Sequence, residues 1–311
     1  MSALSLPGAI LAMLLAAQDA SDIADEASRG SSAADTTRVV LLGTGNPNPD
    51  PDRSGPAVAI VAGGHPYLVD CGPGVVRRAE AARRKGVEVL EASKLDIVFL
   101  THLHSDHTLG CPDLLLSPWV TDRASPLRVY GPPGTRALFD GLLAAYEADI
   151  RNRTTGLQPH EEGGWRAEVT EIDPGVAYED EHVRVTAFLV PHDGWASAYG
   201  YRFETADRTV VVSGDTRPSD AIVEACRGCD VLVHEVYSDA AFARLPVEWQ
   251  RYHADAHTSA SELARLAGRA RPRLLVLYHQ LFWGASEEEL LAEVKRGYDG
   301  ETVSAHDLDV F

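Results

Sequence analysis

Residues 101–107 read Thr-His-Leu-His-Ser-Asp-His (THLHSDH) and directly follow the apolar run Ile-Val-Phe-Leu at 97–100. Three of the chain's 12 histidines lie in these seven positions, together with an aspartate. Imidazole and carboxylate groups are the ligands that zinc and similar cations take in catalytic sites. Four such groups exceed what one zinc ion with an open position can use. The stretch therefore predicts two adjacent metal ions, which sites of this kind hold about 4 Å apart.

The alternative explanation is a polar loop that happens to be rich in histidine. It would suffice for an isolated H-x-H, but not for H-x-H-x-D-H after an apolar strand. Further ligand-type side chains also stand within three residues after other apolar runs, namely His192, Asp215, the pair His234-Glu235, and His279. Open α/β sheets build their sites at the carboxyl ends of their strands. We therefore expect these side chains to meet the THLHSDH loop in one dinuclear metal site.

Short apolar segments alternate with helical stretches from Arg38 onwards. The predicted strands span 39–42, 57–61, 67–69, 96–100, 127–130, 183–190, 209–212, 231–233 and 274–278. The predicted helices span 75–85, 135–146, 218–226, 259–270 and 286–297. Strands and helices that interleave without a break indicate one α/β domain over about residues 37–311.

The first 17 residues, MSALSLPGAILAMLLAA, are apolar and small, and no Lys or Arg precedes Arg29. The segment is too short, and too interrupted by Pro7-Gly8, to predict a membrane span. It is similar to the apolar core of a secretory signal, although a basic n-region and a clean cleavage site are missing. Residues 18–36 are polar, small and acidic, as in a flexible linker. We expect a periplasmic or secreted protein, with a cytoplasmic protein as the alternative.

The net charge and the cysteine count limit which partners and which redox chemistry we expect. Lys+Arg 28 against Asp+Glu 46 gives a net charge of −18, which argues against a long nucleic-acid partner because phosphates are repelled. Four cysteines, at 71, 111, 226 and 229, do not make a disulfide framework in a chain of 311 residues. Cys226-Arg227-Gly228-Cys229 is a lone C-x-x-C, and zinc or redox use would need a second pair. We expect ordinary thiols.

The order of these motifs carries a family resemblance. H-x-H-x-D-H, a distant His, the Asp of S-G-D-T and a final His resemble the metallo-β-lactamase superfamily, and more closely its ribonuclease Z-like branch. Segments 39–45, 68–72, 198–202, 213–217 and 257–259 match that branch in order. The resemblance covers nearly all of residues 38–280. It implies a four-layer αβ/βα sandwich, in the α/β class, with the site at one edge.

The resemblance also implies a role for each candidate residue. The implied ligands of one metal are His102, His104 and His192, those of the other are Asp106, His107 and His279, and Asp215 bridges the two. Asp106 is also counted with Glu235 and His257 as catalytic. A histidine held by a carboxylate can deliver a proton to a leaving alkoxide near neutral pH. The expected nucleophile is a metal-bridging hydroxide, and the expected metal is zinc, with manganese or iron as alternatives.

Departures from the branch bear on the substrate. The tRNA-maturing members carry an arm between the G-Y-R strand and the S-G-D-T strand, but here only ten residues separate Arg202 from Ser213. Those members also commonly have glycine where this chain has Ser105. We therefore predict hydrolysis of small phosphodiesters, with an arylsulfatase acting at the same site as the alternative. A lactonase or β-lactamase would not need Glu235 and His257, and a tRNA 3′-processing endonuclease would need the arm.

Two other classes are also disfavoured. A non-catalytic interaction subunit would have lost ligands, and a di-iron redox protein would need length for a flavin or electron-transfer domain.

Substrate contacts are harder to predict. Arg53 and Ser54 lie in the Pro-rich loop 46–55, where the branch places the rim of its site, and Arg53 is a candidate partner for an anionic ester. Trp195 and the pair Phe282-Trp283 are candidates for an aromatic wall. A solvated turn, loop packing or a homodimer contact would explain the same residues. We expect a small anionic ester as partner and no membrane.

Overall fold

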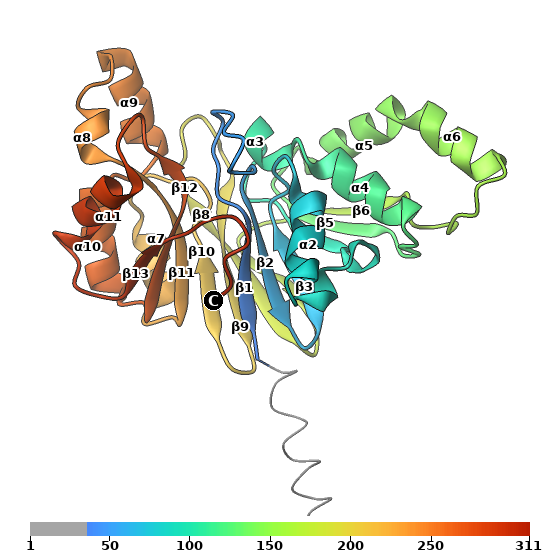
Figure 1. Cartoon of the computed structure of the whole chain (residues 1–311), viewed down its shortest axis with the longest axis horizontal. Helices are drawn as coiled ribbons and strands as arrows, with labels where there is room; N and C mark the ends of the chain where they lie inside the picture. The colour runs from blue at the N-terminus through green and yellow to red at the C-terminus, as the bar shows by residue number, and fades with distance from the viewer. Residues whose placement is uncertain (1–35) are drawn as a thin grey trace, which may run out of the picture. The chain divides into compact units, whose positions relative to one another are not determined.

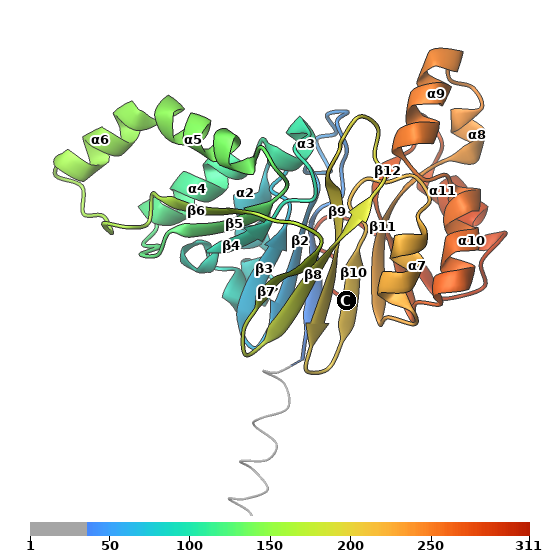
Figure 2. The same ribbon diagram turned by 180° about the vertical axis from the view of Figure 1, so that it is seen from behind.

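The computed structural model describes residues 36–311, so the expected signal segment (1–17) and nearly all of the expected linker (18–36) lie outside the described residues. Residues 37–311 form one compact unit. It contains two mixed β-sheets that face each other, with helices on the outer face of each (Figures 1 and 2). The expected four-layer αβ/βα sandwich is confirmed.

The first sheet has six strands in chain order and the second has seven. The first consists of β1 (Arg38–Gly43), β2 (Ala57–Ala62), β3 (His65–Val69), β4 (Ile97–Phe99), β5 (Leu127–Gly131) and β6 (Ala167–Glu171). The second runs β13 (Thr302–Ser304), β12 (Leu274–Leu281), β11 (Val231–Tyr237), β10 (Thr209–Val212), β9 (Ala198–Thr205), β8 (Val183–Val190) and β7 (Gly175–Glu179).

Helices cover both outer faces and one edge of the sandwich. On the first sheet lie α2 (Val75–Arg84), α4 (Cys111–Val120), α5 (Thr135–Ala145) and α6 (Glu147–Thr155), and on the second lie α7 (Asp220–Cys226), α10 (Ala260–Ala270) and α11 (Glu287–Lys295). The short α3 (Ser105–Thr108), α8 (Asp239–Phe242) and α9 (Val247–Ala256) stand at the upper edge in Figure 1, and two 3₁₀ turns span Glu88–Leu90 and Ala92–Lys94.

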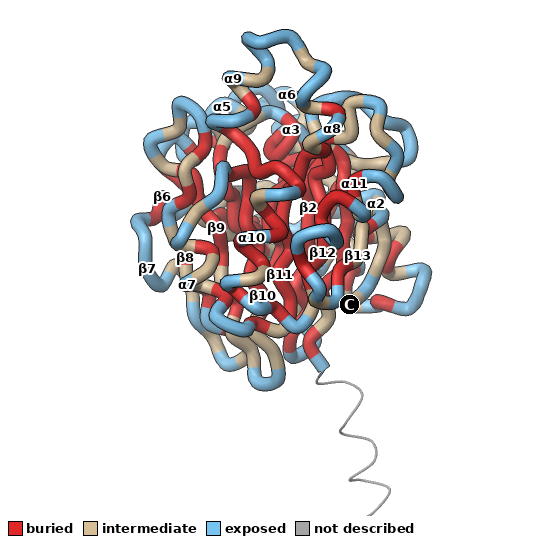
Figure 3. Tube along the Cα trace, turned by 90° about the vertical axis from the view of Figure 1, so that its left-hand side faces the viewer, coloured by how far each residue is buried: buried red, intermediate tan, exposed pale blue. Residues whose placement is uncertain are grey.

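Three apolar clusters fill the spaces between these layers. The central cluster lies between the sheets, where the ring of Phe99 packs 5.6 Å from Tyr201 and 5.7 Å from Phe203. The other two lie between each sheet and its helices. Strands buried on both faces appear as the red interior of Figure 3. This burial explains why the strands read as continuous apolar runs rather than as alternating ones.

The strand directions bring the chemistry-bearing residues to one edge. Strands β10, β11 and β12 are parallel, and β8 has the same direction because it and β10 are both antiparallel to β9. The two sheets are tied at this edge by the Tyr199 N–H, which donates to the Thr101 carbonyl over 2.8 Å. The ends of β4, β8, β10, β11 and β12 therefore converge.

Two strands that carry site residues run past their predicted ends. Strand β11 continues to Tyr237 and β12 to Leu281, so Glu235 and His279 lie inside strands rather than after them. The pairing skips from Tyr278 to Gln280 opposite Glu235 and Val236, which leaves His279 as a bulge with φ 44°. A bulge re-aims the side chain of its extra residue. His279 therefore faces the edge although the strand continues.

The expectation of ordinary thiols is wrong. Cys71 pairs with Cys111 and Cys226 with Cys229, with Cα separations of 5.2 and 4.7 Å, as disulfides require. The first pair forms because the Gly110 N–H donates to the Cys71 carbonyl and the Cys71 N–H to the His107 carbonyl, over 2.8 and 2.9 Å. Such long-range contacts are not visible in cysteine spacing. In residues 36–311, no helix is long and apolar enough to cross a membrane.

Helix α4 depends on a buried arginine. Pro118 lies inside the helix and has no N–H, so it cannot donate to the Leu114 carbonyl. The Arg123 side chain supplies the missing donor over 2.9 Å and also donates to the carbonyls of Leu95, Leu115, Ser125 and Gly164. Burial lowers the pKa of Arg123 to about 10, which leaves it protonated at neutral pH. One side chain thus joins α4 to three loop segments.

We expect Arg123→Met to lower the free energy of unfolding by about 3 kcal/mol or more, because several buried carbonyls lose a charged donor at once. Urea unfolding followed by circular dichroism measures this. Arg77→Met, at an arginine whose side chain is 80% exposed, is the matched control and should change the value by less than about 0.5 kcal/mol. Equal losses in the two variants would contradict this account of α4.

Candidate metal centre

The THLHSDH segment supplies side chains to the edge from a loop and one helical turn. His102 and His104 follow β4, and the turn of α3 carries Asp106 and His107. The turn is closed by the His107 N–H, which donates to the His104 carbonyl over 3.2 Å, and by the Thr108 hydroxyl, which donates to the same carbonyl over 2.9 Å. Four polar side chains therefore project from one short, hydrogen-bonded segment.

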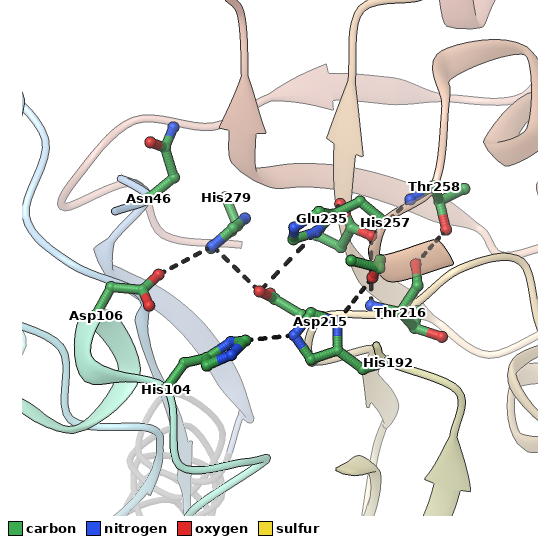
Figure 4. Close-up of polar contacts among 12 residues, drawn as sticks. Asn46, His104, Asp106, His192, Asp215, Thr216, Glu235, His257, Thr258 and His279 are labelled. Carbon is green, nitrogen blue, oxygen red and sulfur yellow. Dashed lines mark hydrogen bonds and ion pairs between the residues drawn. The ribbon is translucent and has the colours of Figure 1, made fainter. Parts of the chain in front are cut away.

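The other expected ligands meet this segment from the second sheet (Figure 4). Three overlapping groups have ligand atoms within 4.8 Å of one another: His102, His104, His192 and Asp215; Asp106, His107 and His279; and Asp215, His257 and His279. Asp215 belongs to two of them. The structure thus brings together all seven residues that the sequence nominated as ligands.

Asp215 lies between the two groups of ligands. One carboxylate oxygen is 3.4 Å from His107 Nε2, and the other is 3.4 Å from His279 Nε2 and 3.9 Å from His102 Nε2. Within the first group, His104 Nδ1 lies 3.0 Å from His102 Nε2 and 3.1 Å from His192 Nε2. A single carboxylate is therefore within reach of both groups, the position that a bridging ligand needs.

Contacts behind these residues fix how the rings point. Asp70, in the left-handed region with φ 62°, lies 2.8 Å from His107 Nδ1 and accepts from the backbone N–H and the hydroxyl of Thr101. His192 Nδ1 is 2.7 Å from the Ala256 carbonyl. Each ring is thereby held with Nε2 toward the centre. A carboxylate or carbonyl behind a histidine is the usual way in which proteins orient metal ligands.

A second carboxylate–histidine pair borders the centre. Glu235 accepts from the Thr258 N–H over 2.8 Å, and its other oxygen lies 3.5 Å from His257 Nδ1. His257 Nδ1 is also 4.0 Å from Asp215. His257 ends α9, and Ser259 then caps α10 with a reciprocal capping box. The pair is therefore held by β11 on one side and by a capped helix on the other.

Burial dominates the protonation of these groups. It lowers the pKa of His102 well below its ordinary value, so the ring is neutral and keeps a lone pair. Although burial opposes it, the surrounding imidazoles, His279 foremost, hold the pKa of Asp215 well below its usual range. Burial and the charge of Asp215 raise the pKa of Glu235, and burial lowers that of His257 to about 4. Burial thus disfavours the charged form of both groups, and their facing atoms, Glu235 Oε2 and His257 Nδ1, have no hydrogen-bond partner.

These side chains fit a cation. Buried His107 Nε2 and Asp215 Oδ1 have no hydrogen-bond partner, although both face the centre. Asp106 and Asp215 place two buried carboxylates among these imidazoles, and buried negative charge is costly without a counter-charge. A set of imidazoles and carboxylates without cysteine suits zinc, manganese or iron. The site thus has the ligand atoms and the buried negative charge that a divalent metal ion requires.

The three residues predicted to contact substrate, Arg53, Ser54 and Trp195, have different surroundings in the structure. The guanidinium of Arg53 donates to Thr44, Gln280 and the Ala305 carbonyl, and its side chain is only 12% exposed. Ser54 lines a hollow of about 490 Å³ that also contains Ser105 and Asp106. The indole N–H of Trp195 donates to His104 Nε2 over 3.0 Å. Arg53 thus holds the rim loop in place, and Trp195 holds the candidate ligand His104. Contact of either residue with substrate stays a prediction.

Two features of the site were not predicted. Asp70 was visible only as part of a matching segment, and its position just after a strand is the signal that could have marked it. A hollow of about 780 Å³ beside His257 is lined by Trp249, Tyr252, His253 and Trp283, among others. The first three lie at i, i+3 and i+4 of helix α9, which the sequence analysis did not predict.

Comparison with known proteins places these features in a family. Residues 65–280 match the "Beta-lactamase superfamily domain" family. A ribonuclease Z from Mycobacterium sp. (strain KMS) is 39% identical over 245 residues, which cover 78% of this chain and 84% of that protein.

The chain belongs to the metallo-β-lactamase superfamily, in its ribonuclease Z-like branch.

Solved structures agree with this assignment. The short form of human tRNase Z superposes with a TM-score of 0.65 at 25% identity, over 88% of this chain and 98% of that one. The metallo-β-lactamase fold protein YhfI from Bacillus subtilis has a TM-score of 0.69 at 21% identity, over 89% and 100%, and supports the fold alone. The predicted family is confirmed, and the chain is a hydrolase that acts on ester bonds.

We expect Asp215→Ala to lose most of its bound divalent metal, because the variant removes the one carboxylate that reaches both ligand groups. Metal content per chain after dialysis, measured by plasma mass spectrometry, tests this. Asp193→Ala, which removes an exposed carboxylate next to His192, is the matched control and should retain metal. Chelation should also lower the melting temperature of the wild type and of Asp193→Ala but not of Asp215→Ala. Full metal content in Asp215→Ala would refute the bridging position.

Proposed function

We propose that the protein is a dinuclear metal-dependent phosphodiesterase for small anionic substrates. The observation that carries the proposal is the Glu235–His257 pair, held 3.5 Å apart beside Asp215. An alkoxide is a poor leaving group and needs a proton as its bond to phosphorus breaks. A buried carboxyl beside a buried imidazole is suited to deliver it. A phenolate leaving from a sulfate ester needs less help.

Two zinc ions are the cofactors that we propose, with manganese or iron as alternatives. His102, His104 and His192 would hold one, Asp106, His107 and His279 the other, and Asp215 both. When bound, the ions supply positive charge for the ester oxygens and a water activated for attack at neutral pH. Asp70, Thr101 and the Ala256 carbonyl keep the imidazoles oriented. Glu235 passes its proton through the His257 ring toward the leaving oxygen.

Small substrates are favoured by the connection between β9 and β10. Thr205 and Thr209 are joined by only three residues, closed by the Thr205 N–H, which donates to the Arg208 carbonyl over 2.9 Å. The branch's tRNA-gripping arm would have to be inserted in this segment. The relatives named ribonuclease Z make an RNA substrate the alternative, and the charge of −18 weighs against it.

Export to the periplasm or outside the cell is part of the proposal, with the cytoplasm as the alternative. Residues 1–17, which suggested it, lie outside the described residues. The two disulfides support export because such bonds persist in oxidising compartments. The exposed apolar side chains of Val247 and Trp249 are compatible with a homodimer contact, which is also part of the proposal.

The first experiment compares kcat/KM for bis(p-nitrophenyl) phosphate and p-nitrophenyl sulfate with one metal-reconstituted preparation. We expect the phosphodiester to be the better substrate, with turnover lost in Asp215→Ala. Dominant sulfate turnover would instead identify an arylsulfatase. If neither ester is cleaved above the Asp215→Ala background, both assignments fail, and lactones and β-lactams are the next candidates.

A second prediction isolates proton delivery. We expect His257→Ala to slow hydrolysis of a dialkyl phosphate by about a hundredfold or more, and hydrolysis of a p-nitrophenyl ester far less, because nitrophenolate leaves without a proton. The measurement is kcat against the acidity of the leaving group, which should fall more steeply in the variant. Because the two substrates share one enzyme preparation, metal loss would lower both rates equally. Equal losses would therefore count against proton delivery by His257.

A further inference from the structure

Two hollows flank the metal centre, and they differ in chemistry. The aromatic pocket of about 780 Å³ has Trp249, Tyr252, His253 and Trp283 in its walls and His257 at its inner side. The polar hollow of about 490 Å³ has Asp106 in its wall. Pro47 and Asn48 line both and therefore separate them. An ester bound at the centre has one substituent on each side.

The aromatic pocket is a surface built largely by one helix. Trp249, Tyr252 and His253 lie one turn apart on α9, and His257 follows one turn beyond His253. The rings of Trp249 and His253 are 5.6 Å apart and nearly parallel, and Trp283 lies 4.4 Å from His253. The aromatic stripe of α9 therefore leads from the open end of the pocket to the proposed proton donor.

Core packing accounts for the buried His253 but not for the exposed Trp249. Trp249 is 52% exposed, whereas the other tryptophan of the wall, Trp283, is partly buried against Tyr237 and Phe242. The lining includes no lysine or arginine, and its one carboxylate is Glu248. A group carrying a phosphate would therefore meet negative charge and apolar surface. A flat, uncharged aromatic group would cover the exposed indole instead.

We propose that the aromatic pocket binds the leaving group of the ester, and that this group is an uncharged arylmethyl alcohol, whose oxygen leaves as an alkoxide. The inference rests on the proposed function, which assigns proton delivery to His257. A proton donor must stand beside the oxygen that departs, and His257 lines the aromatic pocket rather than the polar hollow. Water adds to phosphorus, the bond from phosphorus to the arylmethyl oxygen breaks, that oxygen takes the proton from His257, and the proton lost by the water restores the Glu235–His257 pair. The retained phosphomonoester lies toward the polar hollow.

The test uses two methyl phosphodiesters whose leaving alkoxides have similar acidity but different shape, methyl 2-naphthylmethyl phosphate and methyl cyclohexylmethyl phosphate. We expect wild-type kcat/KM to favour the naphthylmethyl ester by about tenfold, the effect of one or two aromatic contacts. Trp249→Ala should bring the ratio close to one. Val247→Ala, at a 60% exposed residue of the same helix outside the pocket lining, should keep the wild-type ratio.

The outcomes separate the two proposals. No cleavage of either ester above the Asp215→Ala background would overturn the phosphodiesterase. Cleavage of both with a ratio near one, or a ratio that Trp249→Ala leaves unchanged, would overturn the aromatic pocket alone.

Calorimetric titration with 2-naphthylmethanol tests the pocket without turnover. About tenfold weaker binding by Trp249→Ala than by Val247→Ala is expected, and equal binding would overturn the pocket. A wild-type dimer that Trp249→Ala converts to monomer, with the substrate ratio unchanged, would show that a second copy covers this surface instead.

Discussion

The constraint on which the rest of the site depends is the burial of several carboxylates around one small space. Asp70, Asp106 and Asp215 are each less than 10% exposed, and the Asp215 carboxylate lies within 4.0 Å of four imidazoles. Buried charge is stable only with partners or a counter-charge. Away from the centre, the fold gives Asp70 two partners, Thr101 and His107. The atoms that face the centre, such as Asp215 Oδ1 and His107 Nε2, have no hydrogen-bond partner and are free to bind a cation. The Asp70–His107 contact, which orients one candidate ligand, follows from that division.

The sequence was most informative where local pattern and chemistry coincide. THLHSDH, His192 and Asp215 stand just beyond strands β4, β8 and β10, so the apolar run and the polar residue after it could be read together. It was least informative where tertiary contacts decide. His279 faces the site because a bulge turns it inside a strand, and Asp70 acts because β3 lies beside β4. Arg123 stabilises α4 through carbonyls from four segments, which no local pattern encodes.

The cysteine pairing was also not predictable from local sequence pattern. Cys71 and Cys111 are 40 residues apart and do not form a spacing motif. They meet because the chain leaves β3 and enters α4 on either side of the metal-binding turn, whose His107 carbonyl accepts from Cys71. Their disulfide therefore joins the segment after Asp70 to the segment after His107. The covalent link and the Asp70–His107 contact constrain the same turn from its two ends.

The position of the aromatic pocket indicates how substrate choice can vary without disturbing the centre. Helices α8 and α9 occupy the segment between Glu235 and His257, and both ends of that segment are fixed. The Thr258 N–H donates to Glu235, the Tyr237 N–H donates to the Thr258 carbonyl over 3.0 Å, and Ser259 caps α10. Because these contacts hold the Glu235–His257 pair whatever lies between, side chains on α9 can change while the proton donor stays in place. Rigid elements thus carry the chemistry, and the helical segment between them carries the specificity.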